Sequence, residues 1–565
     1  MKMKRIIALA STFLIGATTA SVFTGCGATD SDYDPTKANL TVATYDGGVG
    51  YAWLQDAAQR FMDLHVNSTH FQEGRTGVKI SVDADKVKYG GVKLADSNMT
   101  KDMYFTEGVE YFTFVNRGKV APLTDIISGE KSDMSAYGES GTIEDKLDPS
   151  FQQYLTTTTD KEYYMLPFYS GFYGFIYDIQ LFEEQGFYFD QDGEFLRLKI
   201  RGDEETEKER ADFEAAKSNG PDGKKGTYDD GLPATYAQFT EMVKQIKTKG
   251  YVPFCYSGGY SDYVDKSFRS LAIDHEGYDN FVLNYSFDGE TTLVKEVKAD
   301  GTVVMDDKPT TITPENGYEL QRQAGKYYAL KLQEDLFSSV EYVGGTWNGF
   351  DYTVAQSEFI NSKYASNGKR YAMLLEGVWW ENEAEDTFTE IETVRQEGRA
   401  DRRFGFMSMP KATEDKVGEK QTLFSGNSSF GFINAKCENM DLALEFMKFL
   451  HTDAEMAKFT AKTSIPRSLK YTIDGEIRKT ATPYGKSVID MLADADVVYP
   501  YSALPIVINN YSAFTEGVWF FNSTIGGTVN SPFAVFTADN NKATAKDYFD
   551  GLYTYQKNAW DALQK

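Results

Sequence analysis

The sequence is poor in the residues that build metal sites and disulfide frameworks. Its 565 residues include only three cysteines and four histidines. Cys255 and Cys437 are far apart, and neither belongs to a CxxC pair or to the Cys/His and HExxH spacings of zinc sites. We therefore expect no metal and no cofactor, and we interpret these two cysteines as small buried hydrophobic residues.

The chain has fewer basic than acidic residues, with 58 Lys and Arg against 84 Asp and Glu. Its formal net charge is −26 and its pI is about 4.7. Nucleic acids select basic surfaces, because neutralised phosphates release counterions, so this balance argues against a nucleic-acid partner.

Long apolar runs are missing everywhere except at the N-terminus. Lys2, Lys4 and Arg5 precede a mostly apolar and small stretch, 6–20, which is too short to span a bilayer. Phe23-Thr24-Gly25-Cys26 follows and resembles a bacterial lipobox, in which the cysteine receives a lipid. We interpret 1–25 as a lipoprotein signal peptide and 26–38 as the lipidated Cys26 with a flexible tether. The alternative is ordinary secretion with an incidental cysteine.

Aromatic residues are abundant, with 37 Tyr and 39 Phe. A tyrosine ring is apolar but its hydroxyl needs a hydrogen-bond partner, so an excess of tyrosine suits a wet cleft better than a dry core. A chain of this length exceeds the size of a single core, and we expect at least two folded units.

Strand-like and helix-like segments alternate along the first part of the chain. We predict strands at 40–44 and 78–82, a helix at 51–64 and a helical stretch within 99–116. This alternation predicts an α/β fold with a parallel sheet, whose ligands lie beyond the carboxyl ends of strands. Tyr45 and Asp46 then take a candidate ligand position, although Asp46 could equally be a simple turn former.

Two further segments place tyrosines near strand ends. Residues 163–178 are dense in aromatics and include Tyr169 and Tyr173; an ordinary core strand is the alternative. Tyr260 follows the predicted strand 251–256 in a glycine-containing loop.

The stretch 368–385, GKRYAMLLEGVWWENEAE, predicts a strand, a glycine turn, paired aromatics and a helix start. Trp379 and Trp380 directly follow this turn, and adjacent residues point in different directions. We expect one ring to face a ligand and the other to face the core, although both could simply pack.

Two segments look like insertions. Residues 190–230 are highly charged, and 285–313 contain Asp-Gly turns between short β-type runs, which predict a hairpin. Asp222, Asp229 and Asp230 do not have the spacing of a calcium loop, so we attribute them to turns.

Several separated stretches resemble, in family order, the carbohydrate-type solute-binding proteins of bacterial ABC importers. They are KRYAMLLEGVWW, LPFYSGFYGFIYDIQLFEEQGF, LPATYAQFTEMVKQIKTKGYVPF, FGFMSMPKA and GNSSFGFINAKCENMDLALEFMKFLHTDAEMAKFTAKTSIPRS. The resemblance, to maltose-binding-protein-like lipoproteins, covers nearly the whole chain after the leader. The two insertions are longer than the family needs.

This resemblance implies a two-lobed periplasmic-binding-protein-like fold of type II, with sugar bound between the lobes. The first lobe would comprise 39–165 with 428–463, and the second 168–424 with 465–565. The implied ligand-binding residues are Tyr45, Asp46, Tyr169, Tyr173, Tyr260, Trp347, Glu376, Trp379, Trp380, Ser425 and Asn427.

We therefore expect a monomeric receptor, anchored by lipid at the extracellular face of the membrane, that delivers an oligosaccharide to importer permease subunits. A secreted glycoside hydrolase is one alternative; it would need two suitably spaced carboxylates, for example Glu376 with Glu381 or with Asp46. A surface glycan adhesin is the other.

Overall fold

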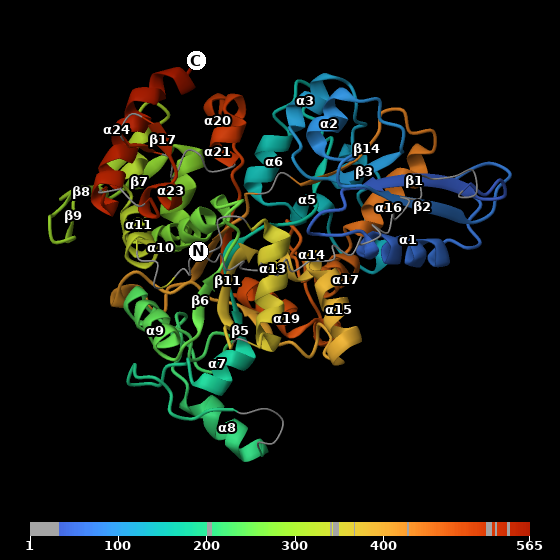
Figure 1. Cartoon of the computed structure of the whole chain (residues 1–565). Coiled ribbons are helices and arrows are strands. Elements are labelled where there is room, and N and C mark those ends of the chain that lie inside the picture. The colour runs from blue at the N-terminus through green and yellow to red at the C-terminus, as the bar shows by residue number, and fades with distance from the viewer. Residues whose placement is uncertain are drawn as a thin grey trace, which may run out of the picture.

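The computed structural model describes residues 33–200, 206–338, 342, 350–366, 368–426, 429–515, 523–525, 528–538 and 543–565. Figure 1 shows two lobes side by side, one containing the blue N-terminal strands and the other containing the green and red segments. Each lobe is built around its own sheet.

The first sheet has the strand order β2-β1-β3-β14-β4. β1, β2 and β3 run parallel, and Val42 pairs with both Val82 and Met103. β14 runs antiparallel to β3 and to β4. The bounds are β1 (Ala38–Thr44), β2 (Val78–Ala84), β3 (Met103–Thr106), β4 (Leu166–Pro167) and β14 (Phe430–Ile433).

The predicted helical stretch within 99–116 was partly wrong. Residues 103–106 form the strand β3, and only Tyr111–Asn116 are helical, as α3. All four residues of β3 are buried between neighbouring strands, and a short apolar run of this kind does not distinguish strand from helix.

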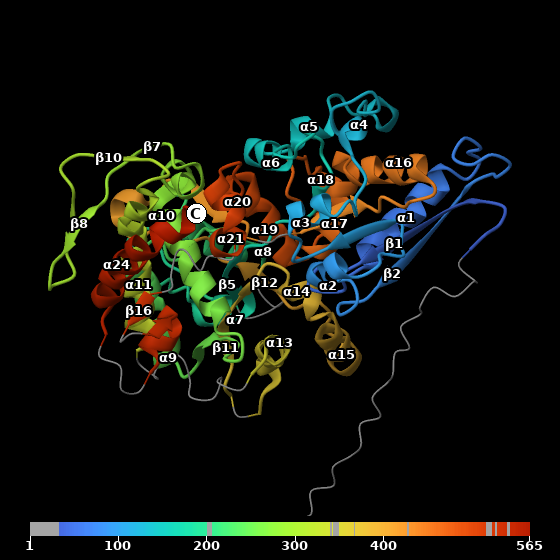
Figure 2. The ribbon, with the colours of Figure 1, turned by 90° about the horizontal axis from the view of Figure 1, so that it is seen from above.

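Helices α1, α16 and α17 belong to the first lobe and pack against each other. Figure 2 shows α1 and α16 beside the strands β1 and β2. The apolar side chains of α1 recur at helical spacing and are buried, so this face builds the core. The bounds of the helices assigned to this lobe are α1 (Ala52–Leu64), α2 (Gly91–Asp96), α4 (Thr124–Ile127), η2 (Ser135–Tyr137), α5 (Ile143–Lys146), α6 (Pro149–Leu155), α16 (Met440–Leu450) and α17 (Asp453–Thr463).

The second sheet has the order β12-β5-β11-β6. β11 is its central strand, antiparallel to β5 and parallel to β6, and all seven of its residues are buried. The long helix α10 packs against both β5 and β11, and its sequence pattern had not been recognised. The bounds are β5 (Tyr173–Asp178), β6 (Val252–Cys255), β11 (Tyr371–Gly377), β12 (Phe404–Phe406) and α10 (Asp262–Ser286).

The remaining helices cover the second sheet or extend beyond it. Their bounds are α7 (Ile179–Gln185), α8 (Glu207–Ala216), α9 (Tyr236–Thr248), η3 (Gly317–Arg322), α11 (Ala324–Phe337), α13 (Tyr352–Asn361), η5 (Ser362–Tyr364), α14 (Trp380–Glu383), α15 (Glu385–Arg395), η6 (Glu414–Lys416), α18 (Gly475–Thr480), α19 (Pro483–Ala493), α20 (Pro505–Asn509), α21 (Tyr511–Thr515), α23 (Pro532–Phe536) and α24 (Ala545–Leu563).

The two segments predicted as insertions contain helix and strand elements of their own. Residues 190–230 contain α8, which projects from the second lobe in Figure 1. Residues 289–312 form two nested antiparallel strand pairs, which confirms the hairpin prediction. The short strands here and elsewhere are β7 (Gly289–Thr291), β8 (Val294–Val297), β9 (Val303–Met305), β10 (Thr310–Ile312), β13 (Gln421–Phe424), β15 (Ala495–Val498), β16 (Ser523–Ile525) and β17 (Thr528–Asn530).

Three segments cross between the lobes, and they lie beside one another. The backbone N–H of Phe168 donates to the carbonyl of Ser429, and that of Ser170 donates to the carbonyl of Pro466. The Ser170 and Ser468 hydroxyl oxygens are 2.9 Å apart. If one lobe moves relative to the other, the backbone of these three adjacent crossing segments has to bend.

Candidate functional site

The carboxyl ends of the three parallel strands of the first sheet meet the second lobe. Tyr45 follows β1, Lys86 lies just beyond β2, and Glu107 directly follows β3. This is the edge at which α/β sheets present ligands. The second lobe supplies the facing residues from α10, from α13 and from the end of β11.

Trp379 is the central aromatic residue of this region. Gly377 ends β11, and Trp379 sits at the start of α14 with an exposed fraction of 8%. Its ring centroid lies 5.1 Å from that of Tyr173 and 6.4 Å from that of Tyr263, both in near-perpendicular edge contacts. On the other side the Trp379 side chain faces Gly48 of the first lobe, where a Cβ atom would lie only 2.6 Å from Trp379 Cγ.

Trp380 has entirely different surroundings. It is fully buried, with the rings of Phe359, Phe388, Phe404 and Tyr484 around it at centroid distances of 5.1 to 5.9 Å. A ring with no exposed surface cannot contact a ligand in this conformation. Its inclusion among the ligand-binding residues is therefore corrected, and it is a core residue of the second lobe.

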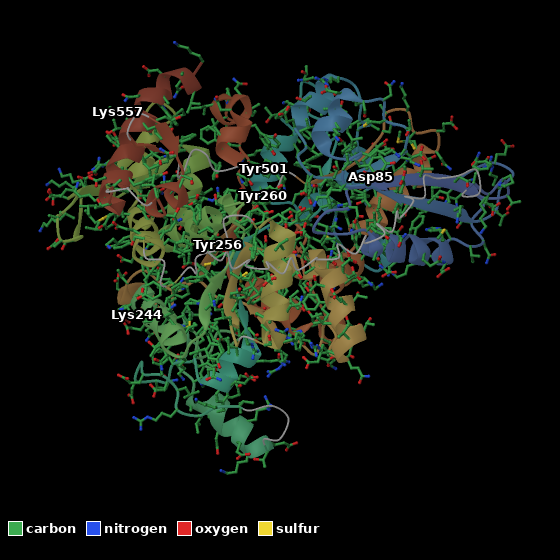
Figure 3. All side chains as sticks on the ribbon, in the orientation of Figure 1. Asp85, Lys244, Tyr256, Tyr260, Tyr501 and Lys557 are labelled. Atoms are coloured by element: carbon green, nitrogen blue, oxygen red, sulfur yellow. The ribbon has the colours of Figure 1, made fainter. Side chains whose placement is uncertain are left out.

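A second aromatic group extends from Tyr263 toward the first lobe. The Tyr260 ring lies 6.4 Å from that of Tyr263 and 5.4 Å from that of Tyr352, and Tyr260 remains 49% exposed. The Lys86 ammonium lies 5.1 Å from the centroid of the Tyr352 ring and donates to the Tyr352 hydroxyl at 2.9 Å. Figure 3 labels Tyr260 in the second lobe and Asp85, the neighbour of Lys86, in the first.

Acidic groups from both lobes surround this contact. Glu383 Oε1 lies 3.5 Å from Lys86 Nζ, and Glu383 Oε2 accepts a 2.9 Å hydrogen bond from the Gln356 side-chain amide. Glu376 Oε2 lies 3.5 Å from the same amide nitrogen, and Glu376 Oε1 accepts from the Gly377 N–H. In the first lobe, Glu107 accepts a 2.6 Å hydrogen bond from the Tyr169 hydroxyl.

Burial shifts the pKa values of these groups toward their neutral forms. Desolvation raises the pKa of Glu107 to about 7, helped by the nearby Glu383 and opposed by the Tyr169 hydroxyl. Desolvation and then Glu383 hold the pKa of Glu376 well above its usual range. Desolvation, more than the charge of Glu107, raises the pKa of Tyr45 to about 12, and burial likewise raises the pKa of Asp46. Perturbed groups gathered in one place are typical of functional sites, although ion-pair networks produce them too.

The structure brings together most, but not all, of the predicted ligand residues. Ser425 is buried in a crossing segment, where its N–H donates to the Val498 carbonyl. Trp347 and Asn427 lie outside the described residues. The residues that the structure brings to this region are Tyr45, Asp46, Tyr169, Tyr173, Tyr260, Glu376 and Trp379.

Sequence reasoning missed several residues of the region. Glu107 was hidden because β3 was predicted as part of a helix; recognising MYFT as a strand would have placed it beside Tyr45. Lys86 follows a correctly predicted strand and could have been found by the same strand-end argument. The residues missed are Lys86, Glu107, Tyr263, Tyr352, Gln356, Asn382 and Glu383.

The described residues contain neither a metal-ion cluster nor a membrane-spanning helix. No cluster of three or more His, Cys, Asp or Glu side chains is arranged to hold a metal ion among them. Within the same part of the chain, no helix has the length and apolar character needed to cross a membrane.

Comparison with known proteins gives a family match and a fold match. The family model described as "Bacterial extracellular solute-binding protein" matches residues 46–457. No curated protein matches the sequence.

Three solved structures are similar over nearly the whole chain. One is a chitin oligosaccharide binding protein (15% identity, 93% of this chain and 99% of that chain, TM-score 0.47). Another is the bacterial solute receptor AcbH, described as preferring β-D-galactopyranose (12%, 93% and 100%, TM-score 0.48). The third comes from work on xylan utilization by Caldanaerobius polysaccharolyticus (13%, 92% and 99%, TM-score 0.50). The similarity to the third structure, at 13% identity, is one of fold alone.

Proposed function

Because this chain belongs to the family of bacterial extracellular solute-binding proteins, we propose that it captures a carbohydrate, specifically an oligosaccharide, and delivers it to an ABC importer. The observation that carries the proposal is the meeting of Trp379, its neighbouring tyrosines and several carboxylates where the two lobes face each other. Sugars present apolar C–H faces that stack on aromatic rings and hydroxyls that need polar partners.

The proposed binding surface draws on both lobes. The first lobe contributes Tyr45, Asp46, Lys86 and Glu107. The crossing segment and second lobe contribute Tyr169, Tyr173, Tyr260, Tyr263, Tyr352, Glu376, Trp379 and Glu383. Trp347 and Asn427 remain proposals from the sequence.

In this conformation the two lobes touch each other across the proposed surface. Asn382 donates to the Gly48 carbonyl at 2.8 Å, and Lys86 reaches Tyr352. A ligand between the lobes would have to replace these contacts. Binding therefore requires that the lobes separate about the crossing segments and close again on the sugar.

The proposal includes attachment to the membrane through Cys26. A diacylglyceryl group on Cys26, followed by the tether 27–38, would hold the monomeric receptor at the extracellular face of the membrane, close to the permease subunits. Two acyl chains anchor firmly where a single chain is marginal.

The hydrolase alternative receives less support. One of its proposed carboxylates, Glu381, is buried and accepts hydrogen bonds from Ser464 at 2.7 Å and Thr482 at 2.8 Å. Its pKa is raised by burial, and both of these hydrogen bonds go to Oε2, which therefore takes part in a structural contact with Ser464 and Thr482. A surface adhesin would use the same aromatic surface without a transport partner.

The test is calorimetric titration of the purified chain with cello-, xylo-, malto- and chito-oligosaccharides, together with small-angle scattering and an assay for sugar release. We expect at least one sugar to bind with micromolar or tighter affinity, to change the scattering profile and to be recovered intact. Cleavage of the bound sugar would establish the hydrolase instead. If no carbohydrate binds, the ligand class is wrong.

A further inference from the structure

The proposed site gathers several hydrogen-bond acceptors around the side chain of Gln356. We use the name acceptor cluster for the carboxylates of Glu107, Glu376 and Glu383 with the side-chain oxygen of Gln356. Gln356 is 1% exposed, and its amide nitrogen is directed at Glu383 and Glu376. Its oxygen, Oε1, is buried and has no hydrogen-bond partner among the described residues.

An unpaired buried acceptor costs free energy unless a donor reaches it. The Glu383 carboxylate, which contacts Lys86, adds to the same imbalance, because a carboxylate only accepts hydrogen bonds. The negative charge of Glu383 also helps to raise the pKa values of both Glu107 and Glu376. Gln356 Oε1 therefore still needs a hydrogen-bond donor, and the negative charge of Glu383 needs a positive partner.

The ammonium of Lys86 is a positive group that contacts the cluster. Lys86 crosses from the first lobe, places its ammonium over the Tyr352 ring and contacts the Tyr352 hydroxyl and Glu383. An ammonium over an aromatic face beside a carboxylate is a favourable arrangement for a positive charge. The Lys86 side chain is 42% exposed and that of Glu383 only 12%, so the lysine lies at the rim and the acceptors lie deeper.

A second nearby lysine, Lys266, is paired with a carboxylate outside the cluster. Lys266 lies 5.0 Å from the Tyr173 ring centroid and forms a 2.7 Å ion pair with Asp262 on its own helix. It balances Asp262 rather than the acceptor cluster. Lys86 is thus the cation that the cluster receives from the facing lobe.

From this we propose that the acceptor cluster selects its ligand by the hydrogen-bond donors that the ligand carries. It accepts uncharged sugars and amino sugars, and it rejects sugars that carry a carboxylate. Lys86 occupies the rim of the cluster until an accepted sugar replaces it. This inference rests on the proposed function and specifies its substrate class. A hydroxyl or amine can donate to Gln356 Oε1 and to the carboxylates. A uronic acid would replace the C6 hydroxyl, a donor, by a negative acceptor-only carboxylate, which beside Glu383 is a repulsive element against the wrong ligand.

The test compares trisaccharides of one backbone that differ in charge. Cellotriose, its glucosamine counterpart and its C6-oxidised glucuronate counterpart are titrated into the full chain at pH 7.5, and a maltotriose series is run in parallel. We expect the neutral and amino forms to bind and the uronate form to bind at least about 10-fold more weakly, as for a like-charge contact. Equal or tighter binding of the uronate form would overturn the inference while leaving the proposed function intact. If no neutral sugar binds, the proposed function fails and this inference fails with it.

A substitution identifies the carboxylate responsible. Glu383→Gln keeps the shape and removes the charge, so the ratio between neutral and uronate affinities should fall by at least about threefold. Glu385→Gln is the matched control, because Glu385 is exposed and lies two residues away in the adjacent helix α15. An unchanged ratio in a folded Glu383→Gln protein would contradict the role given to Glu383.

A second variant keeps the inference testable if Glu383→Gln does not fold. Lys86→Met removes the resident ammonium, and the glucosamine trisaccharide should then bind at least about threefold more tightly, because it no longer competes with the lysine. Lys88→Met is the control, since Lys88 contacts Asp83 and Tyr89 of its own lobe. Equal effects of the two substitutions would show that Lys86 does not compete with the ligand.

Discussion

Adjacent tryptophans at the end of β11 have opposite surroundings, and this difference sets what each can do. Trp379 faces Tyr173, Tyr263 and the backbone of Gly48 across the lobe boundary. Trp380 is enclosed by aromatic side chains of its own lobe. The divergence arises because successive side chains at the start of a helix point in directions about 100° apart.

Replacing each tryptophan by alanine should therefore have different consequences. Trp379→Ala should weaken sugar binding by about 1–3 kcal/mol with little loss of stability, because its ring forms the proposed stacking surface. Trp380→Ala should lower the free energy of unfolding by about 3–5 kcal/mol, because it leaves a cavity in the core. Calorimetric binding and urea unfolding of both variants check this. Early unfolding of both variants with unchanged affinity of the folded fraction would make the pair purely structural.

Glu107 should make stability depend on pH. Its pKa is raised from 4.5 to about 7 in the folded chain, mainly by burial, so the folded state holds a proton that the unfolded state releases. This contribution is fully present below about pH 4.5 and is lost as the pH rises through 7. Glu107→Gln should remove that part of the pH dependence, so its free energy of unfolding should fall less than that of the wild type between pH 5 and pH 8. If the free energy of unfolding changed equally with pH in the two proteins, the pKa of Glu107 would not be raised in the folded state.

At the scale of elements, the loop after β1 and the short helix α14 form a close approach between the lobes. Gly48 has no side chain, and this absence lets Trp379 lie against its backbone while Asn382 donates to its carbonyl. A Cβ atom at this position would lie 2.6 Å from two atoms of the indole, well inside van der Waals contact. The close approach therefore depends on glycine.

Gly48→Ala should hold the lobes apart. We expect a larger radius of gyration in small-angle scattering and a sugar affinity at least about 10-fold weaker, because the closed state that binds ligand becomes less populated. Gly90→Ala is a matched control in another first-lobe loop, since its φ is −62° and an added Cβ would have its nearest contact at 3.8 Å. An unchanged radius and affinity for Gly48→Ala would mean that this contact does not accompany closure.

At the scale of the whole molecule, each lobe has its own sheet, with its own strand order. The segments that join the two lobes are hydrogen-bonded to each other. The lobes also meet at α6, where Phe151 and Tyr154 pack on Tyr501 at centroid distances of 4.5 and 4.9 Å. The lobes therefore contact each other at α6 as well as at Trp379.

The position of the whole molecule at the cell surface should depend on Cys26. Cys26→Ala, expressed in the native host, should move the protein from the membrane fraction to the medium, because the chain then lacks its proposed acyl anchor. Cys437→Ala provides a cysteine control in the folded part of the chain. Retention of Cys26→Ala on the membrane to the same extent as the wild type would show that something else anchors the chain.

The sequence by itself determined the parts of this protein that depend on local pattern. Apolar periodicity located β1 and α1 within two residues, and strand–helix alternation predicted the α/β class. It also indicated that Trp379 and Trp380 would differ, because that expectation needs only the geometry of adjacent residues. The pattern failed at β3, whose four buried residues become a strand only by pairing with β1 and β14.

Only the tertiary structure decided which side chains meet. Lys86 contacts Tyr352 and Glu383, which lie 266 and 297 residues further along the chain. That contact depends on how one lobe is placed against the other, and no local pattern contains this information. The burial that raises the pKa of Glu107 and Glu376 has the same origin, because desolvation is produced by the facing lobe and by the packed helices and not by sequence neighbours.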